Sequence, residues 1–146
     1  MNDSSNTVDL ERFRKAQQNF GTYQRAMAEI RNGRKETHWM WYIFPQMHGL
    51  GISSMSQHYA IHGLEEAKAY LNDPYLGGNL REISQVLMAL DTDNAYEIFG
   101  SPDDIKLRSS MTLFAAAAGE GSVFARVLEK FFGGGYDPLT LHLLGH

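Results

Sequence analysis

The chain has 146 residues, of which 43% are hydrophobic, 12% aromatic and 21% charged, with a formal net charge of −4. These values predict one folded domain over residues 9–146, preceded by a flexible, polar N-terminus at 1–8. The acidic balance argues against a nucleic-acid binder, and the lack of cysteine excludes disulfides and thiolate chemistry. No apolar run is long enough to span a membrane, and the polar start is unlike a signal peptide, so we expect a cytoplasmic protein.

Two helices are predicted at the start of the domain. Apolar residues recur at helical spacing from Asp9 to Phe20, with Asp9 as the expected N-cap. After Gly21, Thr22 is expected to cap a second helix that ends at Asn32-Gly33.

A dense aromatic segment follows, from His38 to Gln46. It holds both tryptophans of the chain, Trp39 and Trp41, and Pro45 ends its regular structure. Its apolar spacing fits either a strand or a buried helical turn. So many aromatic side chains cannot all enter a small core without leaving an indole N–H or a phenol O–H to satisfy. The segment therefore predicts either a core plug or the wall of a pocket.

The middle of the chain alternates between loops and short helices. In order, we expect a loop over 47–56, a helix over 64–71, a break at Asn72-Asp73-Pro74, a helix capped by Asn79 and continuing to Leu90, and a short helix over 95–99 capped by Asp93.

The clearest helix start is Ser101-Pro102-Asp103-Asp104, where a capping hydroxyl precedes a proline and two acids. The helix that it opens is apolar on several sides as far as about Ala118, so we expect it to be central. Ser122 starts another helix, and Asp137-Pro138 starts a short terminal one. About seven or eight helices with loops of varied length predict an all-α, irregular orthogonal bundle.

The expected central helix carries polar residues that favour an anion site. Arg108, Ser109 and Thr112 share one stripe, and Lys106 lies on a separate line. A guanidinium offers a planar fork to a carboxylate or phosphate, and hydroxyl groups add donors. The alternative is a structural ion pair from Arg108 to one of three acids, Asp73, Glu82 or Glu97.

The aromatic segment supplies the other half of the candidate site. Trp39 or Trp41 would stack on a planar ring or a cation, and Gln46 would orient it. His38 is the preferred acid or base because histidine titrates near neutral pH, and Glu36 is a weaker candidate.

We expect neither a metal nor another cofactor. His58 and His62 are spaced i, i+4, but they lack both an obvious third ligand and the intervening glutamate of a zinc protease. The glycine-rich stretches match no phosphate-binding loop.

Four stretches of the chain resemble a bacterial family known as domain of unknown function 1810, from about residue 9 to the C-terminus. They are residues 9–13, residues 33–46 without 36–37, residues 59–61 and residues 99–114. The resemblance implies a mainly α-helical fold and brings no activity and no assigned catalytic residues. Some members carry the label calpastatin. True calpastatin is a disordered chain that folds on its protease, whereas this chain has a full globular core, so that function is not carried over.

The two long family motifs coincide with the aromatic segment and the polar helix, which favours one pocket between them. We expect this pocket, formed by the His38–Gln46 and Lys106–Thr112 segments, to bind a small anionic, ring-containing metabolite such as a nucleotide derivative. If chemistry follows, it would be hydrolysis or group transfer on that ligand. The alternative is a protein–protein interaction module that uses the aromatic segment as an exposed anchor.

Overall fold

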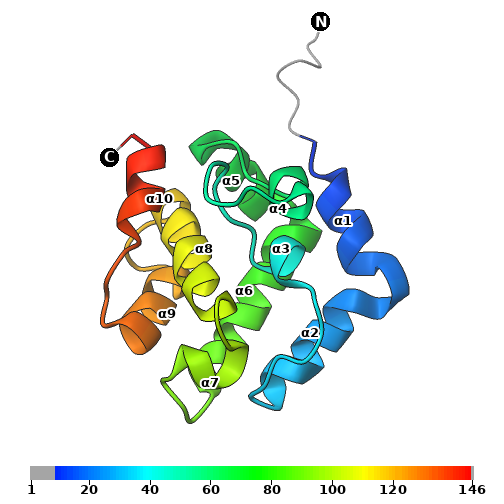
Figure 1. Cartoon of the computed structure of the whole chain (residues 1–146), viewed down its shortest axis with the longest axis vertical. Helices are drawn as coiled ribbons and strands as arrows, with labels where there is room; N and C mark the ends of the chain where they lie inside the picture. The colour runs from blue at the N-terminus through cyan, green and yellow to red at the C-terminus, as the bar shows by residue number, and fades with distance from the viewer. Residues whose placement is uncertain (1–8, 146) are drawn as a thin grey trace, which may run out of the picture.

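The computed structural model describes residues 9–145 and has the all-α fold predicted from the sequence (Figure 1). The predicted flexible tail at 1–8 lies outside the described residues. Within 9–145 there is no β-strand, only an isolated parallel bridge between Met47 and Ile61. No helix in this range is long and apolar enough to cross a membrane.

The elements follow one another with short connections. They are α1 (Glu11–Gln18), the 3₁₀ turn η2 (Asn19–Gly21), α2 (Thr22–Arg31), α3 (Met40–Ile43), α4 (Ser54–His58), α5 (Leu64–Asn72), α6 (Pro74–Ala89), α7 (Ala95–Phe99), α8 (Asp103–Ala118), α9 (Val123–Phe132) and α10 (Pro138–Leu143).

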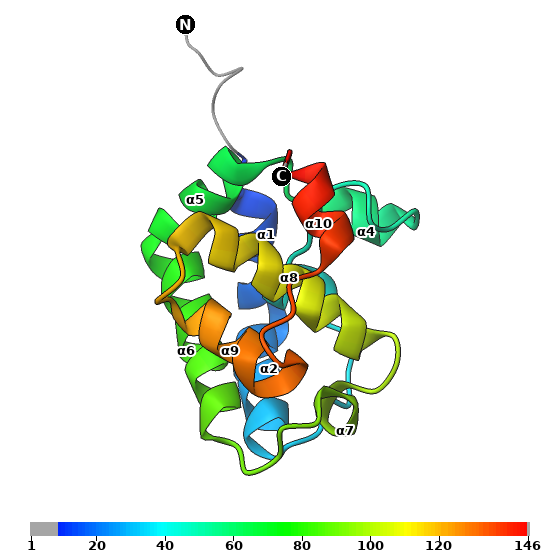
Figure 2. The ribbon, with the colours of Figure 1, turned by 90° about the vertical axis from the view of Figure 1, so that its left-hand side faces the viewer.

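Helix α8 is the centre of the bundle, as its all-round apolar sequence predicts. It contacts α5, α7, α9 and α10. The side view shows α5 and α6 on one side of α8 and α4 on the other (Figure 2). Leu107, Met111 and Phe114 have no exposed surface. Burying each such side chain stabilises the fold by about 1.5–3 kcal/mol.

A row of aromatic rings joins the N-terminal helices to this centre. The ring of Phe13 in α1 lies 5.2 Å from that of Tyr70 in α5, and Tyr70 lies 5.3 Å from Phe114 in α8. Gln17 is buried beside them, where its Nε2 donates to the Tyr70 hydroxyl at 3.0 Å and to the backbone carbonyl of Tyr42 at 2.8 Å. Helix α1 thereby supports α3, the helix of the aromatic segment.

Two predicted helix starts are confirmed. The Ser122 hydroxyl accepts a hydrogen bond from the backbone N–H of Ala125 at the start of α9. The Asp137 carboxylate accepts one from the backbone N–H of Thr140 at the start of α10.

The predicted break at Asn72-Asp73-Pro74 is in fact the boundary between two helices. Asp73 Oδ1 accepts the backbone N–H groups of Tyr75 and Leu76 at 3.0 and 2.9 Å, and Pro74 is the first residue of α6. Proline is well suited to that position because its missing N–H would have had no partner there. The predicted cap Asn79 lies inside α6.

Four further cap predictions are wrong. Leu10 occupies the N-cap position of α1, although Asp9 Oδ1 accepts the N–H of Glu11 at 3.1 Å. Gly21 precedes α2 in place of Thr22, and Asn94 rather than Asp93 caps α7. Ser101 does not cap α8, which begins at Asp103 without a side-chain cap. In its place, the two acids of the first turn of α8 stabilise the helix dipole.

Helices α5 and α6 approach closely at Gly77. A Cβ atom added at Gly77 would lie 2.0 Å from the backbone oxygen of Leu71, whereas one added at the neighbouring Gly78 would meet nothing within 4 Å.

We therefore expect Gly77→Ala to lower the free energy of unfolding by about 1–3 kcal/mol through overpacking. The matched control Gly78→Ala should leave it unchanged or raise it by about 0.5–1 kcal/mol, because alanine favours the helix. Urea unfolding of both variants measures the difference, and equal effects of the two would contradict this packing.

Candidate functional site

The two tryptophans of the aromatic segment lie in different environments. Trp39 is 1% exposed and packs against Phe44 and Phe99 in the core. Trp41, in α3, is half-buried. The two interpretations drawn from the sequence, core plug and pocket wall, thus apply to different residues of one segment.

The Glu29 carboxylate on α2 holds the chain that leads into α3. It accepts hydrogen bonds from the backbone N–H groups of Glu36 and Thr37 at 2.7 and 3.0 Å. It also accepts the Thr37 hydroxyl at 2.6 Å and the Trp39 indole N–H at 2.9 Å. Burial by itself would raise the pKa of Glu29, but the four hydrogen bonds outweigh it and hold this pKa below its ordinary value. A charged carboxylate therefore fixes where α3 begins.

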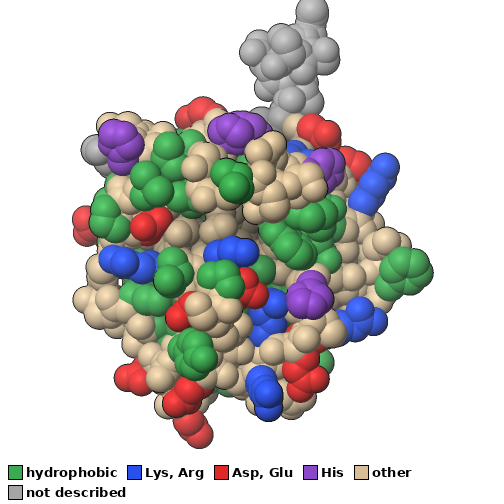
Figure 3. Space-filling view, in the orientation of Figure 1, with side chains coloured by type: hydrophobic (Ala, Val, Ile, Leu, Met, Phe, Trp, Pro, Cys, Tyr) green, Lys and Arg blue, Asp and Glu red, His purple; other side chains and the backbone are tan. Residues whose placement is uncertain are grey.

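Trp41 forms one wall of a hollow between α3, α4 and the first turns of α8, which we call the Trp41 hollow. Its enclosed cavity is small, about 20 Å³, and the rest of the hollow is open to solvent. Basic, hydrophobic and histidine side chains gather near the middle of this face of the molecule (Figure 3). The residues that line the hollow are Met40, Trp41, Gln46, Met47, Gly51, Ser56, Tyr59 and Lys106.

Lys106 is the cation of the Trp41 hollow. Its Nζ lies 6.0 Å from the centre of the Trp41 ring, at the outer limit of a cation–π contact. The same Nζ is 3.7 Å from Asp103 Oδ1, while Asp103 Oδ2 forms a shorter ion pair of 2.9 Å with Lys35. Because Asp103 is engaged more closely by Lys35, the Lys106 ammonium keeps much of its capacity to bind an anion.

Gln46 and Tyr59 add uncharged polar groups to the hollow. The backbone positions Gln46, since its carbonyl accepts the Ile61 N–H at 2.9 Å and the next ladder bond joins His48 to Ile61 at 2.8 Å. Among the described residues, neither the side-chain amide of Gln46 nor the hydroxyl of Tyr59 has a hydrogen-bond partner. Both half-buried groups line the hollow and are able to donate to a ligand.

The predicted polar stripe of α8 does not reach this hollow. The Arg108 Nε and Nη2 atoms donate to the carbonyls of Gly135 and Tyr136 at 2.8 and 2.7 Å. The buried Ser109 hydroxyl donates to Asp137 at 2.9 Å, and the buried Thr112 hydroxyl accepts the Asp137 N–H at 2.8 Å. These three side chains attach the connection between α9 and α10.

Arg108 also lacks the structural ion pair that the sequence offered as the alternative to an anion site. The three acids considered for that pair bind other side chains. Asp73 pairs with Arg14, Glu82 accepts a hydrogen bond from Tyr23, and Glu97 accepts one from Thr92. Of the predicted binding residues, the structure therefore brings together Trp41, Gln46 and Lys106 and separates Trp39, Arg108, Ser109 and Thr112 from them.

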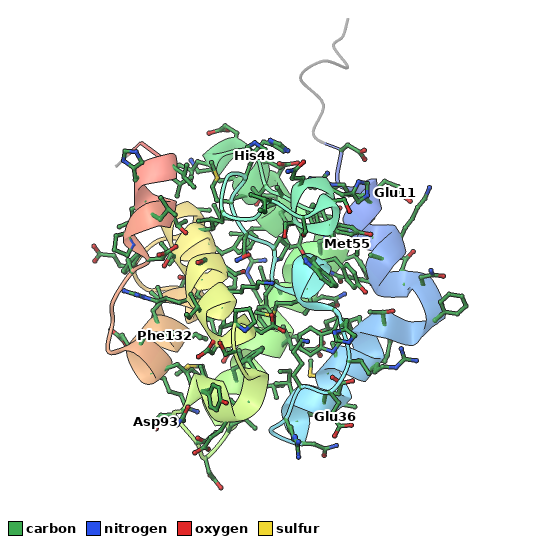
Figure 4. All side chains as sticks on the ribbon, in the orientation of Figure 1. Glu11, Glu36, His48, Met55, Asp93 and Phe132 are labelled. Carbon is green, nitrogen blue, oxygen red and sulfur yellow. The ribbon has the colours of Figure 1, made fainter. Side chains whose placement is uncertain are left out.

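The two candidate acid–base residues lie outside the hollow. His38 is exposed, and its backbone carbonyl accepts the Tyr42 hydroxyl at 3.1 Å. Glu36 is exposed at the α2 end of the molecule, away from α4, where Met55 is labelled (Figure 4). Neither residue lines the Trp41 hollow.

His58 and His62 do not share one helical face, which their i, i+4 spacing would have allowed. Helix α4 ends at His58, so the spacing does not continue to His62 on one helical face. His58 packs on Tyr59, and His62 stacks on His48 with ring centres 4.6 Å apart. Within residues 9–145 no group of three or more histidine, cysteine or acidic residues could hold a metal ion.

Several lining residues were not singled out from the sequence. Met40 lies inside the aromatic segment, Met47 follows it directly, and Gly51 belongs to the expected loop. The Gly51–Ser56 contact is close, since a Cβ at Gly51 would lie 2.5 Å from the Ser56 side chain. Tyr59 belongs to one of the stretches that carried the family resemblance, which was the one signal that could have pointed to it.

Replacing Glu29 by glutamine should lower the free energy of unfolding at pH 7 by about 1–3 kcal/mol, because a charged acceptor of four hydrogen bonds is lost. Since the folded state lowers the pKa of Glu29, this stabilisation is present above the ordinary glutamate pKa. It is lost as the pH falls through that range towards the folded value. The gap between wild type and variant should therefore narrow in acid.

Urea unfolding at neutral and acidic pH measures this gap. Glu36→Gln is the matched control, because the Glu36 side chain is exposed and should show little effect at either pH. A gap for Glu29→Gln that does not change with pH would contradict the assigned role.

Replacing Arg108 by methionine should lower the free energy of unfolding by about 1.5–3 kcal/mol, because two backbone carbonyls lose a charged donor. Arg126→Met is the control, since Arg126 is exposed and has one long bond of 3.4 Å. Thermal unfolding of both variants tests this, and an Arg108 variant as stable as wild type would show that these bonds contribute nothing.

Comparison with known proteins agrees with the resemblance seen in the sequence. The chain is similar to a conserved hypothetical protein, Rv1873, from Mycobacterium tuberculosis, whose crystal structure matches with a TM-score of 0.90 at 45% sequence identity. The match covers 95% of this chain and 98% of that one. No curated protein matches the chain. The model of the family described as protein of unknown function DUF1810 matches residues 7–144, and the chain therefore belongs to that family.

Proposed function

We propose that the protein binds a small anionic molecule with a planar ring in the Trp41 hollow. The observation that carries this proposal is the placement of the Lys106 ammonium beside the half-buried ring of Trp41. A planar ring gains contact energy from the indole, and an anionic group gains charge-assisted hydrogen bonds from the ammonium. The proposal covers binding alone, because neither His38 nor Glu36 lines the hollow.

The geometry favours a pocket over an exposed protein-binding anchor. Trp39 and Phe44 are buried in the core, so a large part of the aromatic surface of the segment is already covered. Binding hot spots are usually large aromatic side chains that become buried only in the complex. Trp41 is half-buried and borders a concave surface, which suits a small ligand.

A thermal-shift screen against nucleotides, sugar phosphates and small organic acids tests the proposal. A ligand at about one hundred times its dissociation constant raises the free energy of unfolding by about 2.7 kcal/mol. We expect a hit that also changes tryptophan fluorescence.

The Lys106→Met variant should lose this hit while remaining folded by circular dichroism. Lys68→Met is the matched control, because Lys68 also pairs with an acid three residues earlier, at 3.8 Å, on the exposed surface of α5. A hit that Lys106→Met leaves intact would place binding elsewhere. The absence of any hit would contradict the proposal and favour the interaction role, to be followed by a search for a protein partner.

A further inference from the structure

The charge around the Trp41 hollow limits the charge of its ligand. Among residues 9–145, Lys106 is the one cation that lines it. Lys35, the next nearest along the same ion-pair chain, has a side chain that is 7% exposed and is held by Asp103 at 2.9 Å. Arg108, the other basic residue of this part of α8, donates to the carbonyls of Gly135 and Tyr136. A ligand therefore meets one available ammonium.

The first acid of α8 makes a highly charged ligand still less suitable. Asp103 Oδ1 lies 3.7 Å from the Lys106 ammonium, so it is close to any anion that this ammonium binds. A phosphate or diphosphate would bring two or more negative charges near the Asp103 carboxylate, which repels them, and one ammonium would have to balance them. A single negative charge is balanced by Lys106 without this excess.

The uncharged donors suit a carboxylate. The Gln46 amide and the Tyr59 hydroxyl line the same hollow as Lys106, and neither has a hydrogen-bond partner among residues 9–145. Together with the ammonium they offer three kinds of donor to the two oxygens of one carboxylate group. An amide and a hydroxyl donate hydrogen bonds without carrying a charge, and so add affinity without requiring more charge on the ligand.

The remaining surface of the hollow suits one small ring. Trp41 supplies a flat aromatic face, and Met40 and Met47 supply polarizable side chains that adapt to a ring edge. The enclosed cavity is small, about 20 Å³, so a ring would lie across the open side of the hollow, against Trp41, and not inside it. A nucleotide, with base, sugar and phosphate, brings more negative charge than this single ammonium balances.

We infer that the ligand class of the Trp41 hollow is an aromatic or heteroaromatic monocarboxylate, with the ring against Trp41 and the carboxylate at Lys106, Gln46 and Tyr59. This inference rests on the proposed function and narrows it, because it replaces the nucleotide derivative expected from the sequence with a smaller ligand of one negative charge.

Matched pairs of probes test the charge requirement directly. Benzoate, nicotinate and quinaldate would be titrated against the protein while tryptophan fluorescence is followed, alongside benzamide, nicotinamide and quinaldamide. Phenyl phosphate and adenosine monophosphate provide more highly charged ligands with a ring. We expect at least one acid to bind about tenfold or more tightly than its amide, which is the effect of one good charged contact, and more tightly than either phosphate.

Variants separate this inference from the proposed function. Lys106→Met should remove the preference for acid over amide, and Lys106→Arg should restore part of it. Gln46→Leu and Tyr59→Phe should each weaken the acid while leaving the amide less affected, and Lys68→Met should change nothing.

Two kinds of outcome would overturn the inference. If a phosphate binds more tightly than every acid, and does so through Trp41 and Lys106, the hollow is a binding site but its ligand is not a monocarboxylate. If acids and amides bind equally, or if no acid changes the fluorescence even at millimolar concentration, the inference is wrong, and the broader screen alone decides whether the proposed function stands.

Discussion

The Glu29 carboxylate is the constraint on which the candidate site depends. Four hydrogen bonds from residues 36–39 converge on it, and one of them comes from the indole of the buried Trp39. Once Trp39 is fixed in the core, the short helix α3 begins at the next residue, and Trp41 emerges two residues later at the surface. The position of the half-buried Trp41 is thus set by a partly buried hydrogen bond from Trp39 to a carboxylate on another helix.

The polar residues of helix α8 face two different parts of the molecule, the connection between α9 and α10 and the Trp41 hollow. Arg108, Ser109 and Thr112 attach the chain between α9 and α10, so their hydrogen-bonding capacity is used within the fold. Lys106 lies two residues before Arg108, a rotation of about 200° around the helix, and it reaches the Trp41 hollow. The fold therefore gives Arg108 a structural role and leaves Lys106 at the candidate site, although Arg108 is chemically the better anion ligand.

Much of the fold could be predicted because its signals are local. The apolar face of α9, the Ser122 and Asp137 caps and the all-round apolar pattern of α8 depend on neighbouring residues, and the structure confirms them. The start of α6 was misplaced because Asp73-Pro74 is equally a break and a capped start, and only the packing of Gly77 against Leu71 shows that two helices meet there. The division between Trp39 and Trp41 depends on Glu29, which lies ten residues earlier on a different helix, and the choice between Arg108 and Lys106 depends on carbonyls nearly thirty residues later. A pattern of neighbouring residues predicts neither of these two long-range contacts.

The two indole N–H groups allow the most direct test of the central claim, that Trp41 and Lys106 form one binding site. The chain has two tryptophans, so a ¹⁵N-labelled sample gives two indole resonances, which the Trp41→Phe variant assigns. On addition of quinaldate, the Trp41 indole resonance should shift in a saturable manner, while that of Trp39, bonded to Glu29 in the core, should stay nearly in place. The Lys106→Met protein should lose that shift. A Trp41 resonance that does not respond to any aromatic acid, or one that responds equally with and without Lys106, would contradict the account.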